Sequence, residues 1–327
     1  MTKGLIMDKA RWKKILSSEA SIILVLLLLC VVVAISAPAF LSGRNILNVL
    51  ARTASTGVVA IGMTFVIATA GIDLSVGGQV TLMGILLATF LRQGMPLPLV
   101  LLLVLFIGIG FGAFNGLVIS KLKFPPFMVT LSLQLITFGF SLFITGGRSI
   151  PIDAPGFYFF GLGNILGLPV PVWIFLLVAA GGFLLSRNFS IGRKILAVGS
   201  NAKGAWYAGI NVSGVITIAY IITGITAFIS AVILSSRLVN ASAVLGRGLE
   251  LNAIAAVVIG GTSLAGGNSF IIGTVAGALI IEVIANWLTL NNVNPFLRDV
   301  VKGGIILLAL FIDVIRRGKL TKNEFAG

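Results

Sequence analysis

The chain contains no histidine and a single cysteine, Cys30, among its 327 residues. The absence of histidine excludes Ser–His–Asp and Cys–His nucleophile systems and the common histidine metal sites. One cysteine can form no internal disulfide bond, and four-cysteine zinc or iron–sulfur sites are impossible. A phosphate-binding loop of the form G-x-x-x-x-G-K-[S/T] is also absent. We therefore expect no metal site, no cofactor and no ATP hydrolysis by this chain alone.

Charged residues are scarce as well, at 10% of the chain, whereas 58% are hydrophobic and the mean hydropathy is +1.14. A soluble domain has about 25% charged residues, so this chain has too few charges to cover a water-facing surface. At about 20 residues per spanning helix, its apolar residues suffice for about ten transmembrane helices. The composition predicts an all-α, polytopic protein in a lipid membrane and excludes a disordered chain and a soluble enzyme fold.

The few charges are mostly positive, with 23 Lys and Arg against 9 Asp and Glu and a net charge of +14. In a soluble protein this surplus would suggest nucleic-acid binding. In a membrane protein it is the expected enrichment of Lys and Arg in cytoplasmic loops. We therefore expect no nucleic-acid partner.

Ten apolar runs follow one another along the chain. They are Ala20–Ala37, Ala54–Ala70, Leu74–Leu91, Leu97–Ile119, Phe127–Ile144, Val170–Leu185, Ser213–Leu234, Leu251–Leu264, Phe270–Leu290 and Val300–Ile315. The first run ends in Ala37-Pro38-Ala39, which resembles a signal-peptidase site. Because it exceeds the usual 7–15 apolar residues of a signal peptide, roughly, we interpret it as a retained anchor.

The basic residues favour an even number of spans with both termini in the cytoplasm. With ten spans, fifteen of the 23 Lys and Arg fall in the cytoplasmic segments 1–19, 120–126, 186–212 and 316–327. Nine or eleven spans would put the two basic termini on opposite sides, against the positive-inside rule. The predicted organisation is a cytoplasmic segment 1–19, a membrane domain 20–315 and a cytoplasmic tail 316–327.

The longest of these cytoplasmic loops, 186–212, is basic and contains a short helical stretch, Ala202–Ala208, that ends at Gly209. Such a helix could dock onto another protein, and the loop could equally be only a solvated connection.

Two glycine-rich segments interrupt apolar runs and align at an offset of 190 residues. ATAGIDLSVGG (68–78) matches VIGGTSLAGGN (258–268) at three positions. Paired interruptions in two halves of a chain point to a transporter site in repeat folds. Because glycine is common in membrane helices, the match is either a two-half pseudo-repeat or chance.

The first of these segments carries Asp73, the only ionisable side chain between Thr53 and Leu91. An Asp at a helix centre costs roughly 2.5–3.5 kcal/mol, so it needs a partner or a role. Asp73 could cap a helix that begins near Leu74. Alternatively, Asp73 lines a solute path together with Ser75 and Gln79. The second acid embedded in a run, Glu282, is open to the same structural and pathway interpretations.

Small residues recur at helical spacing in two runs. Gly108, Gly112 and Gly116 leave one face of the fourth run nearly bare, and Gly273 and Gly277 do the same in the ninth. Such faces let helices approach closely. They indicate packing inside a bundle or, alternatively, a subunit interface.

Five stretches together resemble the ribose-type permease subunit of bacterial ABC sugar importers. They are AIGMTFVIATAGIDLSVGG (60–78), GAFNGLVISKLKFPPFMVTLS (112–132), TGGRSIPI (145–152), IGRKILAVGSNAKGAWYAGINV (191–212) and GLELNAIAAVVIGGTSLAGG (248–267). They occur in the order of the family, and the similarity extends from about Phe40 to Asp313.

The resemblance implies a bundle of about ten helices in the bacterial inner membrane. It also implies three partners, which are a second permease subunit, an ATPase with two fused nucleotide-binding halves and a periplasmic sugar-binding protein. ATP would then bind to the partner. The same resemblance places segment 71–77, with Gly71, close to the translocation path. It assigns coupling to the ATPase to Asn201, Ala202, Ala205, Gly209 and Ile210.

One position departs from the family, which usually has Leu-Asp-Ala-Ile where this chain has Leu251-Asn252-Ala253-Ile254. Asn252 keeps the shape of the aspartate and loses its charge, so we add it to the expected pathway residues. A branched-chain amino-acid ABC permease and a secondary transporter remain the alternative functions. The sequence names neither the sugar nor the identity of the second permease subunit.

Overall fold

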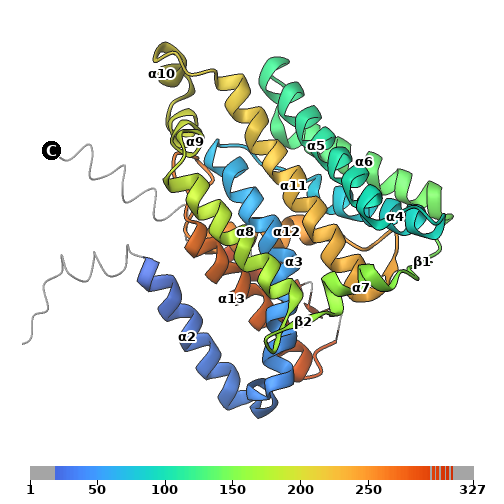
Figure 1. Ribbon diagram of the computed structural model, residues 1–327. Helices are drawn as coiled ribbons and strands as arrows, with labels where there is room; N and C mark the ends of the chain where they lie inside the picture. The colour runs from blue at the N-terminus through green and yellow to red at the C-terminus, as the bar shows by residue number, and fades with distance from the viewer. Residues whose placement is uncertain are drawn as a thin grey trace, which may run out of the picture.

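The computed structural model describes residues 19–294 and, beyond them, residues 297, 298, 300, 301, 303–305, 307, 308 and 311. The described chain is mostly helical (Figure 1). Residues 1–18 of the predicted segment 1–19, the predicted tail 316–327 and half of the tenth apolar run lie outside the described residues.

The described helices mostly follow the predicted runs, although those at 38–41, 155–162 and 190–200 match none of them. They are α2 (Glu19–Ser36), η1 (Pro38–Leu41), α3 (Gly43–Ala68), α4 (Val76–Arg92), α5 (Leu97–Lys121), α6 (Pro126–Thr145), α7 (Pro155–Leu162), α8 (Val170–Arg187), α9 (Ser190–Ser200), α10 (Ala202–Tyr207), α11 (Val212–Leu238), α12 (Leu249–Ile259) and α13 (Ile271–Leu290). The largest deviation is α3, which begins eleven residues before the predicted run because polar residues start it.

Within the described residues, four two-residue strands form two small antiparallel sheets between helices. β1 (Ile150–Pro151) pairs with β4 (Asn240–Ala241), with Ile150 opposite Ala241. β2 (Asn164–Ile165) pairs with β3 (Leu168–Pro169), with Asn164 opposite Pro169. These sheets only hold together the segments that connect helices, so the architecture is that of a helical bundle.

Among the described residues, six helices are long and apolar enough to cross a membrane: α3, α5, α6, α8, α11 and α13. Three further apolar helices are shorter. They are α4 with 17 residues, α12 with 11 residues and the stretch Ser21–Ser36 of α2. A span needs about 20 residues, with a lower limit of about 17, so α12 is too short to cross alone and α4 is at that limit. The composition predicted enough apolar residues but not how they divide into complete and incomplete crossings.

Helix α3 forms the centre of the bundle, and 89% of its most apolar stretch is buried. It is rich in Ala, Gly, Ser and Thr, which let neighbouring helices approach closely. By contrast, only 22% of the corresponding stretch of α5 and 28% of that of α6 are buried. The Leu- and Phe-rich faces of these outer helices are therefore the surface available to lipid or to another subunit.

The glycines at helical spacing lie where two pairs of helices meet. A Cβ on Gly112 of α5 would lie 2.4 Å from the Tyr220 carbonyl oxygen of α11, and Gly224 of α11 in turn faces Gly108. Gly277 of α13 meets the backbone of Ala256 in α12 in the same way, and Gly273 meets that of Gly260 at the end of α12. This geometry favours packing within the bundle over a subunit interface for both stripes.

The loop between α5 and α6 and the segment containing α9 and α10 lie at the same end of the bundle (Figure 1). At this end a hydrogen bond of 2.7 Å joins the hydroxyl groups of Ser120, at the end of α5, and Ser213, at the start of α11. We call this the α10 end. The hairpin of β2 and β3 and the turn at η1 lie at the opposite end.

Candidate translocation and coupling sites

Asp73 lies in the non-helical segment between α3 and α4 and is completely buried. Its Oδ1 atom accepts hydrogen bonds from the Ser75 backbone N–H at 2.9 Å and from the Ser75 hydroxyl at 2.5 Å. The Ser75 hydroxyl oxygen accepts in turn from Gln79 at 2.7 Å and from Asn115 of α5 at 2.9 Å. The predicted pathway residues Asp73, Ser75 and Gln79 therefore form one hydrogen-bonded cluster.

The cluster differs from a simple helix cap. Helix α4 begins at Val76, and Ser75 rather than Asp73 occupies the N-cap position. Asp73 instead closes an Asx turn by accepting the N–H two residues further on. The side chains of Asp73, Ser75, Gln79 and Asn115 are all 0% exposed, so in this conformation they line no open cavity. The cap and pathway interpretations thus share the same residues but need different conformations.

Side chains from other helices satisfy the backbone of this break. The Ile72 carbonyl accepts a hydrogen bond from the Tyr220 hydroxyl of α11 at 3.2 Å and lies 3.5 Å from the Thr130 hydroxyl of α6. Non-helical backbone inside a membrane protein requires such partners. Gly71, one of the predicted pathway residues, packs against the Tyr220 side chain, because a Cβ on Gly71 would lie 2.9 Å from the Tyr220 hydroxyl oxygen.

The two glycine-rich segments of the proposed repeat touch each other. The backbone N–H of Gly267, between α12 and α13, donates to the Ala68 carbonyl at the end of α3 at 3.0 Å. Gly199 of α9 packs on the same spot, because a Cβ on Gly199 would lie 1.8 Å from that oxygen and 2.7 Å from the Gly267 nitrogen. We call this meeting of α9 with the two breaks the glycine junction. The sequence comparison aligned the two breaks but gave no indication of Gly199.

Helix α9 connects the junction to α10 at the end of the bundle. Ile195 and Val198 of α9 are buried against the bundle. The side chain of Asn201 caps α10 by accepting the Gly204 N–H at 2.9 Å. Gly209 ends this helix at a φ of +79°, where glycine is favoured, and the Ile210 N–H bonds back to the Ala205 carbonyl. Asn201, Gly209 and the buried Ala205 therefore shape a short helix that packs on the bundle by one face and leaves the other exposed.

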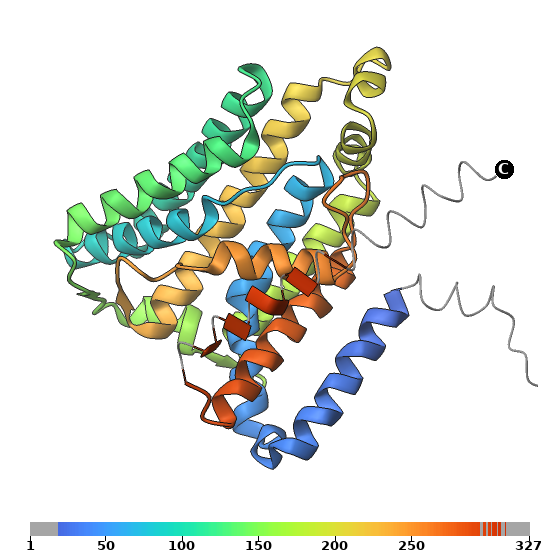
Figure 2. The same cartoon turned by 180° about the vertical axis from the view of Figure 1, so that it is seen from behind.

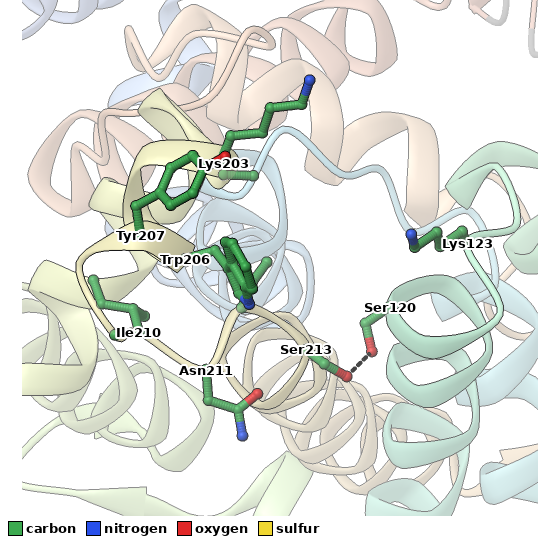
Figure 3. A pocket seen from close by; sticks show the side chains of 11 residues that line it. Ser120, Lys123, Lys203, Trp206, Tyr207, Ile210, Asn211 and Ser213 are labelled. Carbon is green, nitrogen blue, oxygen red and sulfur yellow. Dashed lines mark hydrogen bonds between the residues drawn. The ribbon is translucent and has the colours of Figure 1, made fainter.

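Helix α10 presents an aromatic surface beside a cleft of about 920 Å³. Trp206 and Tyr207 are 65% and 80% exposed, and their rings meet edge to face. Figure 3 shows Trp206 pointing into the cleft, with Ser120 and Lys123 on its far side. The cleft thus lies between α10 and the α5–α6 loop, and its floor is the start of α11.

A second cavity, of about 520 Å³, lies between α3, α11, α12 and α13. The predicted pathway residue Asn252 lines this cavity, whereas none of the Asp73 cluster does. Arg52 and Glu282, also in its wall, form an ion pair at 2.5 Å. The structure therefore divides the predicted pathway residues between a buried cluster and an open cavity.

Sequence reasoning missed the arginines of this second cavity, which we call the arginine cavity. Arg52, Arg237 and Arg247 all line it. A signal was present, because these three are among the eight basic residues that do not fit the cytoplasmic segments. Basic residues placed against the positive-inside rule can mark a site.

Comparison with known proteins fixes the family. A family model described as "Branched-chain amino acid transport system / permease component" matches residues 45–310. The chain belongs to this permease family. No solved structure matches the chain.

Several curated permeases are similar along nearly their whole length. The ribose import permease protein RbsC of Bacillus subtilis (strain 168) is 42% identical over 88% of this chain and 90% of its own. The galactofuranose transporter permease protein YtfT of Escherichia coli (strain K12) is 38% identical over 85% and 82%. The xylose transport system permease protein XylH of Haemophilus influenzae (strain ATCC 51907 / DSM 11121 / KW20 / Rd) is 34% identical over 86% and 92%. This permease is accordingly a multi-pass membrane protein with a transport role.

For this permease we expect Asp73→Ala to lower the stability of the bundle. The change leaves the Ser75 hydroxyl and N–H without their buried acceptor, which costs about 1–3 kcal/mol for each unsatisfied group. Asp73→Asn keeps one acceptor oxygen and should cost less. Thermal unfolding of the purified protein in detergent measures both, with the exposed Asp153→Ala as the control. Equal midpoints for Asp73→Ala and the control would contradict a structural role of the cluster.

Proposed function

We propose that this chain is the transmembrane subunit of an ABC importer that carries a monosaccharide across the bacterial inner membrane. The observation that carries this proposal is the 34–42% identity to ribose, galactofuranose and xylose permeases along most of the chain. A branched-chain amino-acid substrate finds support only in the wording of the family description, and every relative reported above is named for a sugar. A separate ATPase would supply the energy, and a periplasmic binding protein would deliver the sugar.

The proposed topology has ten spans with both termini in the cytoplasm. The cytoplasmic assignments of 120–126 and 186–212 are mutually consistent, because both segments lie at the α10 end. We propose that α4 and α12 each cross together with the glycine-rich segment beside them, so that these two of the ten spans are broken. A second copy or a related permease would cover part of the exposed faces of α5 and α6.

Helix α10 is the proposed contact with the ATPase. Its exposed Trp206 and Tyr207 offer a compact apolar surface, and Lys203 adds a positive charge beside the cleft. Asn201 and Gly209 fix the two ends of the helix, Ala202 opens it, and Ala205 and Ile210 seat it on the bundle. Movement of the ATPase on binding ATP would push this surface as a rigid body.

The glycine junction would transmit the movement of α10 to both glycine-rich breaks. Helix α9 leads directly into α10 and packs at Gly199 against Ala68 and Gly267. A shift of α9 would therefore act on the end of α3 and on the start of α13 together. We propose that this motion opens the Asp73 cluster and alternates the access of the sugar path between the two sides of the membrane.

Uptake of labelled pentoses and hexoses tests the function. A strain that lacks this gene should lose the import of at least one sugar, and the gene on a plasmid should restore it. Affinity purification of the tagged permease should recover an ATPase and a second permease subunit. Loss of branched-chain amino-acid uptake, or sugar uptake that persists without the ATPase, would overturn the proposal.

Gly209→Arg should abolish uptake while the permease still inserts into the membrane. An arginine at a positive φ strains the end of α10 by about 1–3 kcal/mol and places a bulky cation on the proposed docking surface. Gly167→Arg is the matched control, because Gly167 has a φ of +81° at the opposite end of the bundle. Membrane content and ATP-dependent uptake measure the effect. Equal uptake in the two variants would contradict the assignment of α10.

A further inference from the structure

Four charged side chains from four different segments meet at the arginine cavity. Arg52 comes from α3, Arg237 from the end of α11, Arg247 from the loop before α12 and Glu282 from α13. The cavity volume of about 520 Å³ falls within the range of about 300–1,000 Å³ that is typical of small-molecule sites. Its size and its lining suit a small polar ligand.

A structural ion pair does not account for this concentration of charge. Charged side chains inside a membrane bundle are costly, and those that occur usually pair or serve a polar pathway. The pair of Arg52 and Glu282 needs only one arginine. Arg237 is half-buried in the same wall and lies near enough to Glu282 for their charges to interact, but in the described part of the chain its guanidinium makes no hydrogen bond or ion pair.

Two neutral side chains of the cavity also have hydrogen-bonding capacity to spare. Within the described residues, neither the hydroxyl of Thr56 nor the amide of Asn252 takes part in a side-chain hydrogen bond. A guanidinium only donates, a carboxylate only accepts, and a hydroxyl or an amide does both. A sugar hydroxyl donates and accepts at once, so this mixed set matches a polyhydroxylated ring better than it matches an ion. Leu234 and Ile281 add apolar surface for its C–H faces.

The position of the cavity suits entry from outside the cell. Helix α11 begins next to α10 and continues for 27 residues, or roughly 40 Å, to Leu238 in the cavity wall. If α10 meets the ATPase in the cytoplasm, the arginine cavity lies towards the other side of the membrane. Figure 2 shows α12 and α13, which form one side of the cavity, meeting at an angle.

We propose that the arginine cavity is the first site at which the monosaccharide contacts the permease after leaving its binding protein. Arg237, Asn252 and Thr56 hydrogen-bond the sugar hydroxyls, and Glu282, held by Arg52, accepts from them. Release into the permease requires that binding at this first site be weak. This inference rests on the proposed function, whose failure is separable in the test below.

The test uses the complete transporter with its ATPase and binding protein in proteoliposomes, and labelled D-ribose, D-xylose and D-galactose as probes. Thr56→Val removes a hydroxyl without changing shape, Asn252→Leu removes the amide, and Arg237→Gln removes the guanidinium. Each should lower uptake about tenfold, as expected for loss of a polar contact, and should change the ratio of the three sugars. ATP hydrolysis stimulated by the loaded binding protein should stay intact. Arg148→Gln, an exposed arginine outside the cavity, is the matched control.

Three results would overturn the inference. In the first, all three variants import the sugars as Arg148→Gln does. In the second, uptake falls together with stimulated ATP hydrolysis while the sugar ratio is unchanged, which indicates a structural role. In the third, the unmodified transporter imports none of the three sugars, which refutes the proposed function itself.

Discussion

Gly199→Ala is expected to lower sugar uptake about 5- to 150-fold while the permease remains in the membrane. The added Cβ would lie 1.8 Å from the Ala68 carbonyl oxygen and 2.7 Å from the Gly267 nitrogen, and both are backbone atoms. Backbone cannot rotate aside as a flexible side chain can, so α9 must move away from the glycine junction. The move would also weaken the hydrogen bond between Gly267 and Ala68.

The expected defect is in coupling rather than in folding. Overpacking of this kind costs about 1–3 kcal/mol, which a bundle of this size can absorb. The same energy is comparable to a typical coupling energy between two sites, and uptake depends on that coupling. Gly181→Ala in α8 is the matched control, because a Cβ there meets nothing within 4 Å.

Uptake and ATP hydrolysis measured on the same proteoliposomes distinguish the alternatives. We expect the Gly199→Ala transporter to hydrolyse ATP with little sugar moved per ATP consumed. Sugar uptake equal to that of Gly181→Ala would show that the glycine junction does not couple ATP hydrolysis to transport. Loss of the protein from the membrane would assign Gly199 a folding role only.

The sequence predicted the helices well because hydrophobicity decides them. Runs such as Leu97–Ile119 and Phe270–Leu290 match α5 and α13 to within two residues, since apolar length fixes where a membrane helix starts and stops. The start of α3 was wrong by more, because Arg44 and Arg52 do not look like part of an apolar helix. Their cost is offset by contacts such as the pair with Glu282, which hydropathy along the chain does not record.

The site was predictable only where a residue stands out against its own neighbours. Asp73 stood out as a lone charge in an apolar run, and the structure surrounds it with Ser75, Gln79 and Asn115. Asn115 lies forty residues after Ser75 in the sequence, so its role depends on how α5 packs beside α4. Gly199 looked like any other glycine of a loop, because its role consists of a backbone contact between segments distant in sequence.

Gly112→Val is expected to remove most of the folded permease from the membrane. A Cβ on Gly112 alone would lie 2.4 Å from the Tyr220 carbonyl oxygen and 2.6 Å from Ile221 Cα, both in the backbone of α11. Gly112→Ala should cost about 1–3 kcal/mol, and the two further methyl groups of valine should cost more. Membrane content and the midpoint of thermal unfolding in detergent measure the series.

The helix itself supplies the control. Gly110 lies two residues before Gly112 on the same helix, and a Cβ there meets nothing within 4 Å. Gly110→Ala should therefore leave the midpoint unchanged or raise it, because alanine favours a helix over glycine by about 0.5–1 kcal/mol. Equal midpoints for Gly110→Ala and Gly112→Ala would contradict close packing of α5 on α11.

The same substitution should also disturb the break at Asp73. Tyr220, whose carbonyl Gly112 touches, donates its hydroxyl to the Ile72 carbonyl inside that break. Moving α11 away from α5 withdraws this donor and leaves a buried carbonyl with only the long contact from Thr130. In Gly112→Ala, the milder variant, sugar uptake should therefore fall by a larger factor than the amount of permease in the membrane. A folding defect alone would lower uptake and permease content by the same factor. The small-residue face of α5 would then set the position of Tyr220 as well as the stability of the bundle.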